Sequence, residues 1–339
     1  PLSNKRIVII FASGPSGPAE ELQALSDAGH VLKLGRSQML QDRKPFSDQE
    51  LIKSCHRAQI LMASHLESVT DNVLKQLPEL LMVIVPFIGV DRVDLDSATK
   101  LGIAVANSPT PENFISVAEA AIGLSLALLK RIKHNETRLR NGLWGGLNDR
   151  GDLLFKKTFG IVGLGRSGVE VARRLEPWGV RLLASDPYAD PLRASQLNVE
   201  LVDLPTLLAE SDVVSLHATV TPESRHLICE QTLALMKQDA ILVNTARGAL
   251  VDEIALVKVL NEGKIRAAAL DSFQQEPLPA GHLLRNVDPA RLILTPHNVC
   301  QSQDGRKAGI ALAIEQILEV GNGFTPRHLL NSSVTSRWR

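Results

Sequence analysis

The sequence is poor in the residues that mark several common classes of binding protein. Only 4% of its 339 residues are aromatic, too few for the stacking platform on which single-stranded nucleic acid binds. Basic and acidic residues number 37 each, so the formal net charge is zero. No general attraction to nucleic acid or to an acidic membrane surface is therefore expected.

Cysteines are also few and widely spaced. The three, Cys55, Cys229 and Cys300, form no CxxC pair, so neither a disulfide framework nor a zinc site is indicated. Metal-ligand spacings such as HExxH are absent, and so is the GxSxG of serine hydrolases. The N-terminus lacks a signal-peptide pattern, and the most apolar segment, residues 80–90, is too short to span a bilayer. We expect a cytoplasmic protein that binds no metal, nucleic acid or membrane.

Short apolar runs alternate with amphipathic segments of helical period along most of the chain. The runs expected to form strands are residues 6–11, 59–63, 80–85, 159–162, 181–184, 213–216, 241–243, 267–270 and 292–294. Strands that alternate with helices predict βαβ units and doubly wound parallel sheets. A length of 339 residues suits two such domains better than one.

Two long apolar segments, residues 113–133 and 308–320, interrupt this alternation. Each follows a βα set, so we expect each to be a helix that crosses between domains. The first domain is then built from both chain ends, with the second inserted in it. The predicted division is residues 1–107 and 300–339 for the first domain and 108–299 for the second.

A glycine-rich loop of the sequence Gly163-Leu164-Gly165-Arg166-Ser167-Gly168 follows one predicted strand and opens an amphipathic segment. Such glycines permit a tight turn and close approach to a pyrophosphate at a helix N-terminus. Asp186, at the end of the next predicted strand, would accept hydrogen bonds from ribose hydroxyls and repel a 2′-phosphate, which favours NAD over NADP. The alternatives are a plain βα turn and, for Asp186, a turn residue before Pro187.

Polar stretches follow the last three predicted strands. They are Asn244-Thr245-Ala246-Arg247-Gly248, the stretch DSFQQEP from Asp271 to Pro277, and Thr295-Pro296-His297. Ligand sites of α/β proteins lie at such strand ends. Arg247 is suited to hold a carboxylate bidentately, and His297 to exchange a proton near neutral pH. Glu276, if hydrogen-bonded to His297, would fix its tautomer and keep it protonated for carbonyl reduction.

Each of these residues also has an ordinary structural interpretation. Arg247 alone fits a surface salt bridge, Glu276 a solvated loop acid, and His297 a cap for the next segment. Three such residues at three successive strand ends rarely converge by accident, which favours one site. His217, at the end of the run 213–216, either packs against the cofactor or is structural, and Asp271 either accepts a hydrogen bond from the nicotinamide amide or is a turn acid.

In these motifs the chain resembles the D-isomer-specific 2-hydroxyacid dehydrogenase family. The segments similar to the family pattern are Ile88-Gly89-Val90-Asp91 with Val93-Asp94, residues 102–107 with Pro109 and Val117-Ala118-Glu119, residues 160–165, residues 214–217, Asn244–Gly248, Leu270-Asp271, Glu276-Pro277 and Thr295–His297. They occur in order over nearly the whole chain. Together they are far more specific than any one of them.

The resemblance implies a Rossmann NAD-binding domain inserted into a flavodoxin-like substrate domain. It implies NAD-dependent hydride transfer between NAD(H) and a small 2-hydroxy or 2-keto acid of D configuration. Arg247 would bind the carboxylate and the reacting oxygen, and His297 would be the general acid or base with Glu276 as its partner. Backbone groups of Ile88 and Gly89 would grip the carboxylate. The expected cofactor-binding residues are Gly163, Gly165, Arg166, Ser167, Gly168, Asp186, His217, Thr245, Ala246 and Asp271.

The family usually forms homodimers through the NAD-binding domain, so residues 113–133 and the loop of Trp144 are expected in that contact. Phe87 stands where a small residue is frequent, and we expect it to narrow the pocket. Within the family, a phosphoglycerate dehydrogenase with a regulatory tail is not favoured, because the chain ends soon after the second crossing helix, but a short form without that tail stays open. Two further alternatives stay open: a phosphite dehydrogenase-like enzyme, and an NAD-sensing corepressor without turnover.

Overall fold

The computed structural model describes residues 8–14, 22–37, 46–63 and 67–335 of the chain. The chain divides into two compact units, one of residues 1–113 with 302–339 and the other of residues 114–301. The boundaries expected from the sequence are 107/108 and 299/300. Residues 6 and 7 of the first predicted strand lie outside the described residues.

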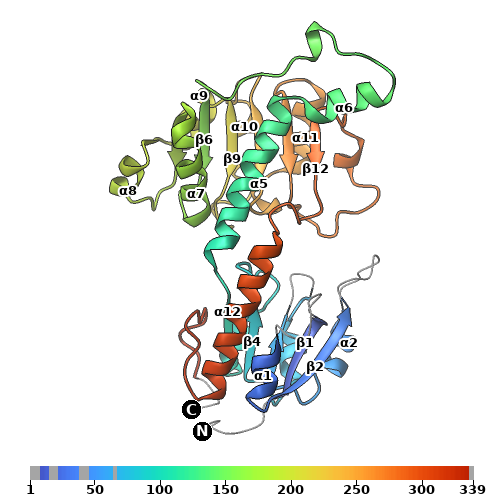
Figure 1. Ribbon diagram of the computed structural model, residues 1–339, viewed down its shortest axis with the longest axis vertical. Coiled ribbons are helices and arrows are strands. Elements are labelled where there is room, and N and C mark those ends of the chain that lie inside the picture. Colours follow the sequence, from blue (N-terminus) through green and yellow to red (C-terminus); the bar gives the residue numbers. More distant parts are fainter. Residues whose placement is uncertain (1–7, 15–21, 38–45, 64–66, 336–339) are drawn as a thin grey trace. The chain divides into compact units, whose positions relative to one another are not determined.

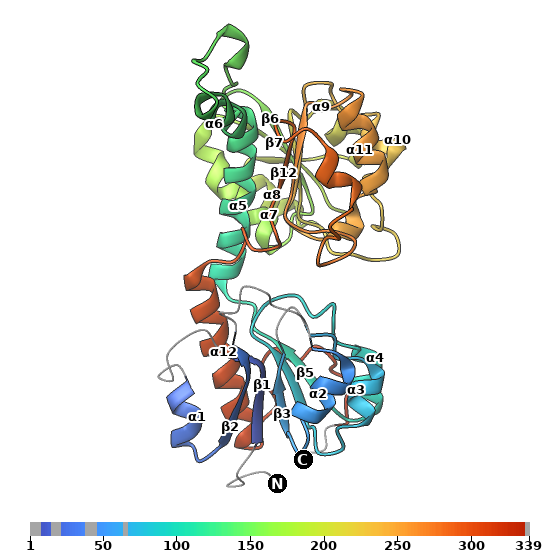
Figure 2. The same cartoon turned by 90° about the vertical axis from the view of Figure 1, so that its right-hand side faces the viewer.

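The first unit contains a five-stranded parallel sheet in the order β2-β1-β3-β4-β5, which is the flavodoxin-like order. Its strands are β1 (Val8–Gly14), β2 (Val31–Ser37), β3 (Ile60–Met62), β4 (Met82–Val85) and β5 (Ala104–Asn107). Its helices are α1 (Gln23–Asp27), α2 (Asp48–Ser54), α3 (Asp71–Lys75), α4 (Leu95–Lys100) and α12 (Gln303–Gly321). Helices α1 and α12 cover one face of this sheet, and α2, α3 and α4 cover the other (Figure 2).

The second unit contains a seven-stranded parallel sheet in the order β12-β11-β10-β9-β6-β7-β8. Counted from its first strand β6, the order is the dinucleotide-binding 3-2-1-4-5-6 with β12 added at the edge. The strands are β6 (Thr158–Val162), β7 (Arg181–Ser185), β8 (Val199–Leu201), β9 (Val213–Leu216), β10 (Ile241–Asn244), β11 (Ala267–Leu270) and β12 (Leu292–Leu294). The predicted pair of doubly wound parallel α/β sheets is therefore confirmed.

Helices cover both faces of the second sheet (Figure 1). The helices are α5 (Pro111–Leu129), α6 (Ile132–Arg140), α7 (Arg166–Leu175), α8 (Pro191–Gln196), α9 (Leu204–Glu210), α10 (Glu230–Leu233) and α11 (Glu253–Asn261), and short 3₁₀ turns are η2 (Leu147–Asp149), η3 (Glu176–Trp178), η4 (Gly248–Leu250) and η5 (Leu283–Asn286). One core cluster joins α5 and α7 to the sheet, and another joins α9, α10 and α11 to it. Strands buried on both faces explain why their sequences read as continuous apolar runs.

The segment 113–133, expected as one helix, is two helices. Helix α5 begins earlier, at Pro111, and ends at Leu129; Arg131 then adopts a left-handed backbone with φ of 53° before α6 begins. The carbonyl of Leu129 accepts the amide of Asp152 at 2.9 Å and the Arg266 guanidinium at 3.2 Å. These outside donors satisfy a helix-terminal carbonyl, so the helix can stop there.

Helix α12 also begins earlier than the sequence pattern indicates, at Gln303 rather than residue 308. Ser302 caps it by accepting the amide of Gly305 at 2.9 Å. The segment after α12 includes a buried anchor: Asn331 accepts the amide of Val105 at 2.8 Å and donates to the carbonyl of Ile103 at 2.9 Å. Residues 336–339 lie outside the described residues.

Helix α5 is the one helix of the described residues with the length and hydropathy of a membrane span. Residues 80–90, the most apolar segment by sequence, contain only the four-residue strand β4. Ala118, Ala121 and Leu128 of α5 pack into the core of the second unit. A single such helix is weak support for a membrane protein, because the core helix of a soluble domain has the same composition.

Candidate active site

The three glycines of the loop between β6 and α7 have separate roles. Gly163 has φ of +94°, and a Cβ there would lie 2.7 Å from the amide nitrogen of Ala218. A Cβ on Gly168 would lie 2.2 Å from the carbonyl oxygen of Gly163. Gly165, in contrast, has nothing within 4 Å of its Cβ position. The first and last glycines permit the turn and the helix packing, and Gly165 leaves the open approach that a pyrophosphate needs.

Asp186, at the end of β7, joins this loop to the neighbouring strand. Its Oδ2 accepts the amide of Leu164 and its Oδ1 accepts the amide of Tyr188, both at 2.8 Å. Asp186 is therefore also the turn residue of the alternative interpretation. Each carboxylate oxygen has a second lone pair, so the side chain can still accept hydrogen bonds from ribose hydroxyls. The loop's Arg166 stacks over the ring of Phe114 at 5.2 Å, while Ser167 is partly exposed.

Four buried polar atoms in this part of the described structure have no hydrogen-bond partner. They are His217 Nδ1, Thr245 Oγ1, Asp271 Oδ2 and Ser272 Oγ, which follow the neighbouring strands β9, β10 and β11. Unpaired buried polar atoms are costly, and four at adjacent strand ends indicate that a polar ligand completes them. The amide and ribose groups of a nicotinamide nucleotide fit this need.

His217 is held as a neutral ring. Its Nε2 lies 2.8 Å from the hydroxyl of Ser215, and burial lowers the pKa of His217 to about 4. Its backbone adjoins Gly163, because a Cβ on that glycine would lie 2.8 Å from the His217 carbonyl carbon. An uncharged ring beside the glycine loop is suited to pack against a cofactor.

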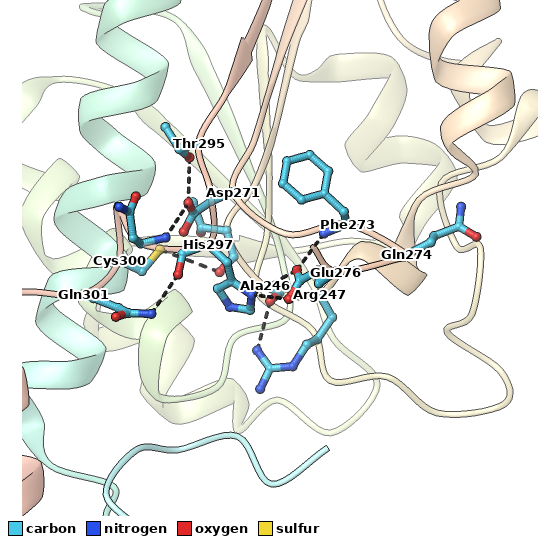
Figure 3. A network of polar contacts seen from close by, with 12 residues as sticks. Ala246, Arg247, Asp271, Phe273, Gln274, Glu276, Thr295, His297, Cys300 and Gln301 are labelled. Atoms are coloured by element: carbon cyan, nitrogen blue, oxygen red, sulfur yellow. Dashed lines mark hydrogen bonds and ion pairs between the residues drawn. The ribbon is translucent and has the colours of Figure 1, made fainter. Parts of the chain in front are cut away.

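The turn after β10 fixes the backbone on both sides of Arg247. The buried Asn244 accepts the amide of Ala246 at 3.0 Å and donates to the carbonyl of Arg247 at 2.9 Å. Gly248 permits close packing, since a Cβ there would lie 1.9 Å from the carbonyl carbon of Phe273. The Arg247 guanidinium donates to the carbonyl of Ala246 at 2.9 Å and is partly exposed (Figure 3).

His297 and Glu276 face one another (Figure 3). His297 Nδ1 lies 2.8 Å from Glu276 Oε2 and 3.0 Å from Glu276 Oε1. Oε1 also accepts the amide of Phe273 at 2.9 Å. The side chains are 32% and 26% exposed, so the pair is accessible but shielded. In the tautomer with a proton on Nδ1 directed at the carboxylate, Nε2 is the ring nitrogen left for proton exchange with a reactant.

Asp271 has a positioning role that the sequence did not reveal. Its Oδ1 accepts the hydroxyl of Thr295 at 2.6 Å and the amides of Asn298 at 3.0 Å and Val299 at 3.3 Å. These bonds bracket His297, whose φ of 52° lies in the left-handed region. Gln301 adds a bond from Nε2 to the carbonyl of His297 at 2.7 Å. In the sequence, only the polar residues that follow His297, such as Asn298 and Gln301, hint at these contacts.

In the first unit, Ile88 and Gly89 lie in the loop after β4. Asn107 Nδ2 donates to the carbonyl of Ile88 at 2.7 Å, and the amide of Ser108 donates to the carbonyl of Phe87 at 3.0 Å. The ring of Phe87 packs against the core of its own unit. Residues at the end of β5 therefore fix this loop through its carbonyl groups. The backbone amides of the loop are the groups that the sequence predicts to bind a carboxylate.

The structure therefore brings Arg247, Glu276, His297 and Asp271 together at the carboxyl ends of the strands of the second sheet. The glycine loop lies at the same end of this sheet. Ile88 and Gly89 belong to the first unit. Among the described residues, no group of three or more His, Cys, Asp or Glu side chains is arranged to hold a metal ion.

The fold and site define a dinucleotide-binding α/β protein with an arginine and a histidine–glutamate pair at neighbouring strand ends. Residues 122–298 match the model of the D-isomer specific 2-hydroxyacid dehydrogenase NAD binding domain. The chain belongs to the D-isomer specific 2-hydroxyacid dehydrogenase family, which confirms the resemblance, and this domain is its NAD-binding part.

Two curated relatives illustrate the range of the family. The chain is 38% identical over 284 residues to a D-3-phosphoglycerate dehydrogenase of Methanocaldococcus jannaschii, matching 84% of this chain and 53% of that protein. It is 38% identical over 299 residues to a glyoxylate reductase of Thermofilum pendens, matching 86% of each. The chain spans about half the length of the phosphoglycerate dehydrogenases it matches.

Among solved structures, the TT0316 protein from Thermus thermophilus has a TM-score of 0.85 at 31% identity, covering 96% of this chain and all of that one. The D-lactate dehydrogenase of Escherichia coli has a TM-score of 0.79 at 28% identity, covering 95% and 99%. Proteins named for different acids thus share this fold.

Proposed function

We propose that this protein is an NAD-dependent oxidoreductase that interconverts a small 2-keto acid and the D-2-hydroxy acid. The observation that carries the proposal is the His297–Glu276 pair, joined at 2.8 Å on the sheet edge that also carries Arg247 and the glycine loop. The bound nicotinamide supplies or accepts the hydride. All other tasks fall to residues of the chain.

Each residue has a distinct task in this proposal. Arg247 binds the substrate carboxylate and stabilises negative charge on the reacting oxygen. His297 donates a proton from Nε2 during reduction and takes it back during oxidation, while Glu276 holds the ring in the required tautomer. The backbone amides of Ile88 and Gly89, in the first unit, remain proposed carboxylate-binding groups, as the sequence predicts.

The cofactor is expected to be NAD in preference to NADP. Asp186 places a carboxylate at the end of β7 and shares its oxygens with two backbone amides. A 2′-phosphate near it would meet like charge, whereas ribose hydroxyls can donate to it. The remaining cofactor contacts are proposed for Gly163, Gly165, Arg166, Ser167, Gly168, His217, Thr245, Ala246 and Asp271.

The test is a panel of substrates with NADH and NADPH in parallel. Glyoxylate, hydroxypyruvate, phosphohydroxypyruvate, pyruvate and bulkier 2-keto acids are added singly, and loss of absorbance by the reduced cofactor is followed. Oxidation of phosphite with NAD is a separate arm. Turnover of a keto acid with NADH is expected; turnover of phosphite alone would replace the substrate class, and NADH binding without any turnover would favour the sensor.

We further propose a homodimer formed through the second unit. Residues 132–155 expose a series of large apolar side chains: Ile132, Leu139, Leu143, Trp144, Leu147, Leu153 and Phe155, of which Trp144 is 86% exposed. A second copy of the chain would cover so large an apolar surface. Sedimentation of a Trp144→Ser variant should show monomers, whereas Tyr188→Ser, which alters an equally exposed aromatic, should leave the dimer intact.

A cytoplasmic location is the last part of the proposal. Cys55, Cys229 and Cys300 are free thiols, and unpaired cysteines are the norm where the environment is reducing. Fractionation of cells that produce the protein would test the location directly.

A further inference from the structure

Glu253 is a buried carboxylate close to the proposed site but outside it. It is the first residue of α11, and only 4% of its surface is exposed. A glutamate at a helix N-terminus is ordinary, since it interacts with the helix dipole. Here, however, the preceding Asp252 already caps the helix by accepting the amides of Ile254 and Ala255. The burial of Glu253 therefore needs another explanation.

The carboxylate of Glu253 is directed at the loop that carries Glu276. Its Oε1 accepts the amide of Gln274 at 2.8 Å, and its Oε2 lies 3.3 Å from Nε2 of His282. The Gln274 side chain is itself fixed, because it donates to the carbonyl of Val251 at 2.8 Å and lies 3.2 Å from Nε2 of His226. This end of the loop is therefore held by both its backbone and its side chain.

The same peptide unit is confined from the opposite direction. A Cβ on Gly248 would lie 1.9 Å from the carbonyl carbon of Phe273 and 2.4 Å from the nitrogen of Gln274. Two consecutive amides thus end on two carboxylates: that of Phe273 on Glu276, and that of Gln274 on Glu253. Gly248 directly follows Arg247, so the peptide between Phe273 and Gln274 packs against the turn that carries the arginine. The amide of Phe273 joins this peptide to Glu276, the partner of His297 (Figure 3).

We propose that Glu253 is a positioning residue that clamps the peptide between Phe273 and Gln274 against Gly248 and thereby holds Glu276 on His297. The inference rests on the proposed function, since it assigns work to the same histidine pair. Burial raises the pKa of Glu253, which shows that the charge has a cost; the amide of Gln274 and the His282 ring act in the opposite direction. The ionisable groups that face Glu253 are His282, His226 and Glu276.

Three variants test the clamp. Glu253→Ala removes the acceptor, Glu253→Gln keeps an oxygen for the amide of Gln274, and Glu262→Ala alters an exposed glutamate at the other end of the same helix. For Glu253→Ala we expect kcat of keto-acid reduction to fall roughly tenfold or more, with little change in the Kd of NADH. Glu253→Gln should recover most of kcat, and Glu262→Ala should match the unaltered protein.

A double-variant cycle separates positioning from general stability. If Glu253 acts through Glu276, then Glu253→Ala should cost far less in a Glu276→Gln background than in the unaltered protein, because the positioned group is already lost. Additive losses, or a loss of thermal stability with unchanged kcat, would overturn the proposal.

NMR tests the clamp even without turnover. The ring signals of His297, assigned by their loss in His297→Gln, should shift in Glu253→Ala and stay unchanged in Glu262→Ala, because only the first variant lets the ring lose its carboxylate partner. Unmoved His297 signals in Glu253→Ala would reject the clamp. Absence of turnover in the unaltered protein would reject the proposed function instead, so the two failures are distinguishable.

Discussion

The two units differ in the residues that follow the carboxyl ends of their strands. In the second unit, strands β9 to β12 are followed by side chains whose chemistry is plain, such as Arg247, Asp271 and His297. In the first unit, the loop after β4 has Ile88 and Gly89, which can offer polar groups only from the backbone. The side chain of Asn107 holds this loop through the carbonyl of Ile88.

The two units therefore offer a ligand different kinds of chemical group. Side chains at strand ends can bind a charge or move a proton, so they define a reaction. Ile88 and Gly89 offer backbone amides, to which the proposed function assigns carboxylate binding. Relatives named for phosphoglycerate, glyoxylate and lactate share this fold. The proposed function assigns the reaction itself to the side chains of the second unit.

The largest expected effect tests the side-chain half of this comparison. Replacing Arg247 by alanine should lower kcat/KM for the keto acid on the order of 10²-fold or more, because carboxylate binding and oxyanion stabilisation are lost together. Arg181→Ala is the control, since Arg181 pairs with Glu200 and Glu210 on the surface of the same unit. Steady-state kinetics with NADH measure both; unchanged kinetics in the Arg247 variant would remove the arginine from the mechanism.

The same contrast explains what the sequence could predict. Residue type and order were enough for the glycine loop, for the predicted meeting of Glu276 with His297, and for both sheets, because buried parallel strands read as apolar runs bounded by polar ends. The catalytic roles themselves stay predictions until the kinetics above are measured.

The features that escaped prediction depend on long-range contacts. Strand β2 includes Lys33, Gly35 and Arg36, and β8 is a three-residue edge strand with two exposed positions, so neither has an apolar run. Helix α5 ends at Leu129, whose carbonyl accepts hydrogen bonds from the Asp152 amide and the Arg266 guanidinium, both outside the helix. The positioning contacts of Asp271 likewise join segments more than twenty residues apart, where no local pattern signals them.

Cofactor choice gives the next largest effect. Asp186→Asn removes the charge and keeps one side-chain oxygen, which can accept from the amide of Leu164 or from that of Tyr188 but not from both. The ratio of kcat/KM with NADPH to that with NADH should rise about tenfold, as expected when like-charge repulsion of about 1.4 kcal/mol is relieved. Asp190→Asn, a nearby cap of α8, is the matched control. A protein that already prefers NADPH would contradict the role given to Asp186.

A smaller effect is expected in the first unit, where only loop support is changed. Asn107→Ala removes the bond to the carbonyl of Ile88, and a hydrogen bond of about 1 kcal/mol corresponds to roughly a fivefold rise in KM for the keto acid. The KM for NADH should stay constant. Asn72→Ala, which removes an exposed amide bonded to Asp48 in the same unit, should change neither value. A fall in kcat with constant KM would instead place Asn107 in the chemistry.

The smallest expected effect concerns the stability of the polar strand ends in the second unit. Because burial lowers the pKa of His217 from 6.5 to about 4, the unfolded chain binds more protons than the folded one between those values. The folding stability contributed by the neutral ring is present above pH 6.5 and is lost as pH falls toward the folded pKa. Between pH 7 and 5 the loss should be about 1 kcal/mol, allowing for partial solvent access.

Urea unfolding of the protein without added cofactor, at pH 7 and 5, measures this loss. His217→Asn should lose less stability over that interval than the unaltered protein, whereas His56→Gln, a change at an exposed histidine of the first unit, should leave the pH dependence unchanged. Equal losses in all three proteins would mean that His217 is not held neutral. Burial of His217 after β9 would then cost the second unit less folding stability, and a bound nucleotide would have less of that cost to offset.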